Sequence, residues 1–270
     1  MPRFRYCLNA STIRTTPVLD QIRTAAAAGY GAIELWHDHL DEHLRAGGTL
    51  TDVRNAIDDH GLVVPTTIYL AGWFQPAGIE HEHALDEIKR RLHQAATVGA
   101  QFAIAGPPPG QADRDLGAQH YAELLELGKS FGVRPAFEYL GFVDDINTID
   151  DAIDILVRSQ HPDATIVVDP FHCHRGGGPV QSISKLRPHQ IAISHFNDCP
   201  ATPPASLQQD SDRVLPGDGI VDLKLYCDQL TAIGYNSWLS LELFREDLWA
   251  QPPLHVAKLG LEKMQAVAEQ

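Results

Sequence analysis

The stretch QHYAELLELGKSFGVRPAFE, residues 119–138, contains the structural unit that repeats along this chain. In its first part, apolar residues recur three and four positions apart, which is typical of a helix with one buried face. Gly132 follows where such a helix is expected to end, and the run VRPAFE then has the apolar character of a buried strand. One helix, one glycine and one strand therefore make up the unit, and the strand ends in a glutamate.

The same unit can be followed through the whole sequence. We predict eight strands, at residues 3–9, 32–36, 63–70, 101–106, 133–138, 165–169, 191–196 and 238–243. Helical patterns lie between them, at residues 17–29, 83–99, 119–132, 148–159 and 222–234. This alternation predicts an α/β fold in which residues 1–270 form a single (β/α)8 barrel domain. A doubly wound sheet is the alternative, but LNASTIRTTP after the first strand lacks the glycine-rich turn typical of that fold.

The charge and the cysteines limit the possible partners and compartment. Asp and Glu number 35 against 21 Lys and Arg, which gives a net charge of -14. Such a surface repels phosphate backbones and anionic lipids, so we expect no nucleic-acid or membrane partner. No apolar run approaches the ~18 residues of a membrane span, and MPRFRYCLNAST has no signal-peptide core. Four widely separated cysteines suit reduced thiols, and we predict a cytoplasmic protein.

Polar residues follow the apolar runs of four consecutive strands. The fifth strand ends at Glu138, the sixth at Asp169, the seventh reaches His195 and the eighth reaches Glu242. Because parallel strands of a barrel end at one face, these side chains are expected to meet there. Three carboxylates brought together repel one another and need protons or a cation. We therefore predict one divalent metal ion, Mn²⁺, Zn²⁺, Mg²⁺ or Co²⁺; the alternative is four separate, hydrogen-bonded side chains.

Other polar residues lie near the same predicted face. His172, three positions after Asp169, is expected to reach a substrate oxygen. Residues 197–222 form a long Pro-, Asp- and Gly-rich connection after the seventh strand, which we expect to be an active-site loop. It contains Arg213, for which a surface charge is the simplest interpretation. Glu34, in AIELW, either lines the barrel mouth or makes a structural hydrogen bond.

The combination of motifs resembles the xylose-isomerase-like (β/α)8 barrels, a family of sugar isomerases and epimerases. The resemblance rests on CLNAST, AFEYLG, VVDPFHCH, DRVLPGDGIVDL and LSLELFRE, and it is greatest for members that isomerise inososes, the keto-inositols of inositol catabolism. The GPPPG after the fourth strand departs from the family pattern. The resemblance implies a shared metal site and two substrate contacts: Glu138, Asp169, His195 and Glu242 as ligands, and His172 and Arg213 against the substrate.

The predicted chemistry follows from a metal next to two glutamates. An α-hydroxyketone is expected to lose a proton to one carboxylate and regain it from another through an enediolate, with Glu138 and Glu242 as the acid–base pair. No phosphate-binding signature is present, so an unphosphorylated inosose or related ketone is preferred. The alternatives are a ketose 3-epimerase, a hydroxypyruvate-type isomerase, a dehydroshikimate dehydratase-like lyase, a metal-dependent DNA-repair nuclease and a non-catalytic binding barrel. A homodimer is left open.

Overall fold

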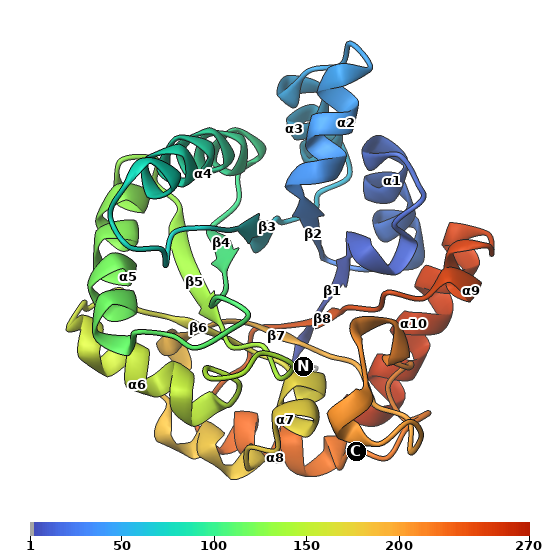
Figure 1. Ribbon diagram of the computed structural model, residues 1–270. Helices are drawn as coiled ribbons and strands as arrows, with labels where there is room; N and C mark the ends of the chain where they lie inside the picture. Colours follow the sequence, from blue (N-terminus) through green and yellow to red (C-terminus); the bar gives the residue numbers. More distant parts are fainter. Residues whose placement is uncertain (1–2) are drawn as a thin grey trace.

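Eight parallel strands close into a barrel in chain order in the computed structural model, which describes residues 3–270 (Figure 1). Pairing of the first strand with the last closes the barrel. The (β/α)8 prediction is confirmed, and every predicted strand is present. The strands are β1 (Arg5–Asn9), β2 (Ala32–Trp36), β3 (Thr66–Leu70), β4 (Phe102–Ala105), β5 (Arg134–Glu138), β6 (Ile166–Val168), β7 (Ile191–His195) and β8 (Trp238–Leu241).

Helices surround the strands as an outer ring (Figure 1). They are α1 (Val18–Ala28), α2 (His37–Arg45), α3 (Leu50–Asp59), α4 (Ile79–Val98), α5 (Arg114–Lys129), α6 (Ile149–Ser159), α7 (Pro170–Gly176), α8 (Leu223–Ala232), α9 (Glu246–Trp249) and α10 (Pro253–Ala268). The predicted helical segments correspond to α1, α4, α5, α6 and α8. Helix α4 begins earlier than predicted because Glu80 and Glu82 extend its first turn, where acidic side chains favour the positive end of the helix dipole.

Glycine ends two helices in the way that the sequence predicts. Gly29 after α1 and Gly99 after α4 have φ angles of 100° and 80°, the left-handed conformation that glycine adopts without a steric cost. The amide of Gly29 donates to carbonyl oxygens of the last turn of α1. Each chain reversal therefore leads directly into the next strand.

Side chains alternate between the inside and the outside of the barrel. One buried cluster takes residues from every strand, among them Cys7, Ala136 and Val167, and it fills the barrel interior. Their neighbours Leu8 and Phe137 belong to the larger cluster, which includes the residues packed between strands and helices. Because successive residues of a strand point to opposite faces, a residue two positions after an interior residue also points inward.

The connection over residues 197–222 is ordered by its own hydrogen bonds. The backbone of Asp198 pairs with Val214, and two short 3-10 turns, η4 (Ala205–Leu207) and η5 (Asp210–Asp212), lie between them. The carboxylate of Asp198 accepts four backbone N–H groups, those of Cys199, Gly217, Gly219 and Val221. A segment without sequence periodicity thus has one defined path.

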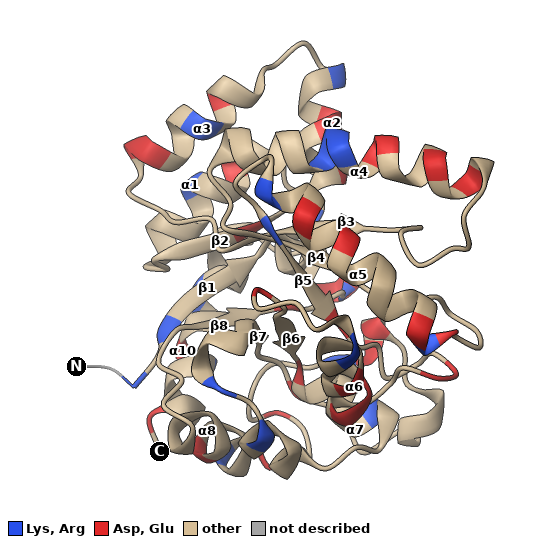
Figure 2. Ribbon diagram, turned by 90° about the vertical axis from the view of Figure 1, so that its left-hand side faces the viewer, with Lys and Arg blue, Asp and Glu red and all other residues tan. Residues whose placement is uncertain are grey.

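Charged side chains are carried mainly by the outer helices and loops. Figure 2 shows acidic and basic residues interspersed over this outer layer. Within residues 3–270, no helix is long and apolar enough to cross a membrane.

Candidate metal centre

Strand alternation brings the four predicted ligands to the same end of the barrel interior. Three of them lie two residues beyond a residue of the interior cluster: Glu138 after Ala136, Asp169 after Val167 and His195 after Ile193. Glu242 lies four residues beyond Trp238, which belongs to the same cluster. All four side chains are buried, and one possible ligand atom from each lies within 4.8 Å of the others. Within residues 3–270, these four residues are the one group of His, Cys, Asp and Glu side chains whose possible ligand atoms lie this close together.

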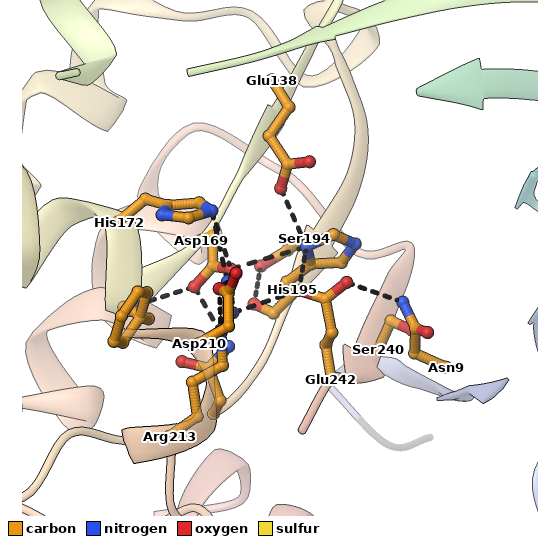
Figure 3. Close-up of polar contacts among 12 residues, drawn as sticks. Asn9, Glu138, Asp169, His172, Ser194, His195, Asp210, Arg213, Ser240 and Glu242 are labelled. Atoms are coloured by element: carbon orange, nitrogen blue, oxygen red, sulfur yellow. Dashed lines mark hydrogen bonds and ion pairs between the residues drawn. The ribbon is translucent and has the colours of Figure 1, made fainter. Parts of the chain in front are cut away.

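The imidazole of His195 is the centre of the group. Its Nδ1 atom lies 3.0 Å from Oε1 of Glu138, 3.0 Å from Oε2 of Glu242 and 3.5 Å from Oδ2 of Asp169. Glu138 and Glu242 approach this nitrogen from different sides (Figure 3). The other ring nitrogen, Nε2, lies 3.4 Å from Oε1 of Glu34. The imidazole therefore separates one deep carboxylate from three that face the barrel mouth.

The donor atoms fit a divalent metal. Neither Nδ1 of His195 nor Oε1 of Glu138 has a hydrogen-bond partner among residues 3–270, although both atoms are buried. Buried polar atoms without partners are costly, so such atoms are expected to serve a bound group. One imidazole nitrogen with three carboxylate oxygens is a donor set that suits Mn²⁺, Zn²⁺, Mg²⁺ or Co²⁺.

The site holds opposing charges in a dry environment. Burial raises the pKa of Glu138 to about 7, and repulsion from Glu242 and Asp169 adds to this while His195 opposes it. Burial also disfavours a charged Asp169, but the Arg213 guanidinium outweighs it and holds the pKa of Asp169 well below its usual range. For His195, the surrounding carboxylates, Glu242 foremost, overcome burial and raise its pKa. Three carboxylates and one imidazole are therefore buried together, and a bound cation would stabilise the charged form of the carboxylates.

Helix α7 begins at Asp169 and places His172 beside it. The Asp169 side chain accepts the backbone N–H of Phe171 at 2.7 Å, and Pro170 occupies the first helical position, where its missing N–H has no cost. The amide of Gly141 donates to Nδ1 of His172 at 3.1 Å. Burial lowers the pKa of His172 to about 4, so the ring is neutral near pH 7 and carries its proton on Nε2.

Arg213 lies inside the site. Its side chain is 1% exposed and stacks on the ring of Phe171, with 4.4 Å from the guanidinium carbon to the ring centroid. It donates to Asp169, and its Nη1 lies 3.1 Å from Oε2 of Glu242. Its Nη2 lies 3.2 Å from Nε2 of His172. The simplest interpretation from the residue pattern, a surface charge, is wrong, because that pattern does not reveal how the loop folds inward.

Two buried residues behind the ligands complete the site. Glu34 is fully buried, which settles the open choice in favour of a hydrogen-bonding role: it accepts from Asn9, Thr66 and Ser240. Burial opposes its ionisation, but His195 and these hydroxyls lower the pKa of Glu34 overall. Asn9 was not predicted as a site residue. Its position two residues after the inward-facing Cys7 is the signal that identifies it.

An apolar hollow of about 350 Å³ lies at the same end of the barrel. Its lining includes Tyr69, Leu140 and Phe142, together with Pro107 of the GPPPG sequence. The ring of Phe142 packs edge-on against His172, with centroids 5.3 Å apart. The polar centre therefore has an apolar neighbour on its His172 side.

Comparisons with known proteins agree with this architecture. The family described as xylose isomerase-like TIM barrel matches residues 22–267. An inosose isomerase of Bacillus velezensis is 26% identical over 273 residues, which cover 97% of this chain and 96% of that protein. A 3-dehydroshikimate dehydratase of Pseudomonas aeruginosa is 26% identical over 262 residues, 91% of this chain and 39% of that protein.

A solved structure has the same fold. The crystal structure of an IOLI protein with a binding zinc atom superimposes with a TM-score of 0.91 at 23% identity, and the match covers 98% of both chains. The family match extends from α1 to α10 and so includes the strands β2 to β8. On this evidence, the chain belongs to the xylose isomerase-like TIM barrel family.

Proposed function

We propose that the protein isomerises inososes, or closely related unphosphorylated α-hydroxyketones, by proton transfer through an enediolate. The observation that carries the proposal is the convergence of Glu138, at the end of β5, and Glu242, the residue after β8, on one imidazole nitrogen at 3.0 Å each. Two carboxylates on different sides of one centre are what proton removal and return require. Inosose isomerases among the relatives support the substrate class.

We propose Glu138, Asp169, His195 and Glu242 as the ligands of one divalent metal. When bound, the metal would polarise the ketone and stabilise the negative charge that develops on oxygen. The protein's own contribution is acid–base chemistry. Glu138 and Glu242 supply it, because carboxylates on different sides of one centre can accept a proton and return it.

His172 and Arg213 are proposed to bind a substrate oxygen. Nη2 of Arg213 lies 3.2 Å from Nε2 of His172, so the two side chains form one polar edge beside the proposed ligands. The guanidinium carries N–H donors, and the imidazole ring can donate as well. A hydroxyl or carbonyl oxygen of the substrate would accept from both, and it would hold the ketone next to Glu138 and Glu242.

The test is a reaction in D₂O followed by NMR. Protein prepared with Mn²⁺, Zn²⁺, Mg²⁺ or Co²⁺ is supplied with inososes and free ketoses, and protein treated with chelator is the control. A carboxylic acid exchanges its proton with solvent, so deuterium is expected on the carbon that receives it. Product without deuterium at either carbon would contradict proton transfer through an enediolate, and no conversion of any ketone would contradict an isomerase.

The same spectra distinguish the alternatives. A ketose 3-epimerase inverts one centre and keeps the ketone in place, whereas a hydroxypyruvate-type isomerase acts on a three-carbon substrate. A dehydratase remains the candidate from another class, because a 3-dehydroshikimate dehydratase is 26% identical over 91% of this chain. Loss of water from 3-dehydroshikimate, with no conversion of inososes, would favour that lyase.

A further inference from the structure

Asn9 makes four hydrogen bonds at the closed end of the metal centre. It is the last residue of β1 and is fully buried. Its Oδ1 accepts from Nε1 of Trp36 at 2.8 Å and from the backbone amide of Ser11 at 3.0 Å. Its Nδ2 donates to Oε1 of Glu34 at 3.2 Å and to Oε1 of Glu242 at 3.0 Å. The amide is therefore fully used.

The surroundings of Asn9 permit a single amide orientation. The indole N–H of Trp36 and the backbone N–H of Ser11 can only donate, and the carboxylate oxygens of Glu34 and Glu242 accept from Nδ2. A flipped amide would place its oxygen against two carboxylates and its NH₂ against two donors. All four bonds would then be lost within a buried site, which makes the observed orientation strongly preferred.

This orientation determines which oxygen Glu242 presents to the centre. Oε1 of Glu242 is occupied by Asn9, and Oε2 lies 3.0 Å from Nδ1 of His195 (Figure 3). The same amide holds Glu34, which also accepts from Thr66 and Ser240 and lies 3.4 Å from Nε2 of His195. Asn9 thus contacts the proposed ligand Glu242 directly. It also contacts Glu34, which lies against Nε2 of the second proposed ligand, His195.

We propose that Asn9, oriented by Trp36, is a positioning residue that sets the direction of the Glu242 carboxylate and, through Glu34, the ring of His195. Groups behind metal ligands commonly have this effect, and their loss weakens metal binding about 10- to 100-fold. The inference rests on the proposed function for the identity of the ligands, and its test measures binding of Mn²⁺ to the protein without substrate.

The experiment compares variants by titration with Mn²⁺ alone, read by electron paramagnetic resonance or calorimetry. Asn9→Ala removes all four bonds, and affinity is expected to fall about 10- to 100-fold. Asn9→Asp keeps the shape and the acceptor for Trp36 and Ser11 but replaces the donor to Glu34 and Glu242 by an acceptor, so the contacts to both glutamates are lost. Trp36→Phe removes one donor that orients the amide, and a smaller loss in the same direction is expected.

A double variant separates positioning from general damage. Trp36→Phe acts through Asn9, so adding it to Asn9→Ala should weaken Mn²⁺ binding little further. Gln94→Ala is the matched control: it also removes a buried amide with two side-chain partners, His37 and Asp41, which lie outside the centre. Its Mn²⁺ affinity should stay within about two-fold of the parent although stability falls.

Each outcome decides the inference. Mn²⁺ affinity of folded Asn9→Ala within two-fold of the parent overturns it, as does a loss of similar size in Gln94→Ala. If Asn9→Ala does not fold, Trp36→Phe decides, and unchanged affinity in that variant overturns the inference. A parent that binds Mn²⁺ but converts no ketone contradicts the proposed function while Asn9 is still tested. A parent that binds no divalent metal overturns both.

Discussion

Glu138 and Glu242 each place one carboxylate oxygen 3.0 Å from Nδ1 of His195, but their surroundings differ. Oε1 of Glu242 accepts from Asn9, whereas Oε1 of Glu138 has no hydrogen-bond partner within residues 3–270. We predict that Glu138→Gln and Glu242→Gln each lower kcat by about 10²- to 10⁴-fold, because an amide keeps the shape but cannot accept the proton. Turnover at saturating metal is the measurement.

The control for this pair is Glu123→Gln, an exposed glutamate on α5. Its kcat should equal that of the parent, and circular dichroism should show the same fold in all three variants. Turnover within a few-fold of the parent in both site variants would contradict the acid–base assignment.

His37 provides a prediction about acid stability at the residue scale. Burial lowers its pKa from 6.5 to about 4, against the effect of a hydrogen bond with Gln94. The folded state therefore binds fewer protons than the unfolded state between pH 6.5 and about 4, and stability is lost as the pH falls through this window. Between pH 7 and 5, this one group is expected to lower the free energy of unfolding by about 2 kcal/mol.

Urea unfolding of the parent and of His37→Gln at both pH values checks this prediction. The parent should lose more free energy of unfolding than the variant over the interval, by about the amount above. Equal losses in the two proteins would show that His37 is not the group responsible.

At the scale of elements, the connection from β7 to α8 places the Arg213 guanidinium beside the carboxylate of Asp169. Its path depends on Asp198, whose carboxylate accepts four backbone N–H groups of this segment. We predict that Asp198→Ala loosens the segment and lowers kcat about as much as Arg213→Ala does, because Arg213 no longer stays beside Asp169. Combining the two changes should add little, since both act through one contact.

Hydrogen exchange provides the structural readout for this prediction. Exchange over residues 198–221 should accelerate in Asp198→Ala, while the barrel strands keep the parent's protection. Asp222→Ala is the control, because it removes only the cap that accepts from the amide of Leu225 at the start of α8. Full activity in Asp198→Ala despite faster exchange would show that turnover does not need an ordered segment, and it would contradict the prediction.

At the scale of the molecule, the proposed metal joins strands β5 to β8 at one point. A ligand that binds the folded state alone stabilises it, by about 2.7 kcal/mol at a free concentration of 100 Kd. For a chain of this size, that corresponds to an increase in Tm of about 5 to 10 °C. We predict such an increase when Mn²⁺ or Zn²⁺ is added to chelator-treated protein, and none in Asp169→Ala.

Differential scanning calorimetry measures Tm for the parent and for Asp169→Ala, with and without added metal. Metal analysis should give one ion per parent chain. K⁺ at equal ionic strength controls for general salt effects. The same increase in Tm for Asp169→Ala and the parent would contradict the ligand assignment.

The alternation of helix and strand patterns was sufficient to predict the barrel, because each unit carries its own apolar periodicity and its own glycine stop. The ends of the strands also identified Glu138, Asp169, His195 and Glu242 as a group, since parallel strands share one end. These features depend on local chemistry and on strand direction, and both can be read from the order of residues.

The position of Arg213, the burial of Glu34 and the role of Asn9 depended on the tertiary structure. Arg213 enters the site because a segment of irregular sequence folds around Asp198, and no periodic pattern specifies such a path. Asn9 and Glu242 are separated by 233 positions and meet only when β1 closes against β8. Contacts of this kind are set by how the barrel closes, and closure is a property of the folded chain as a whole.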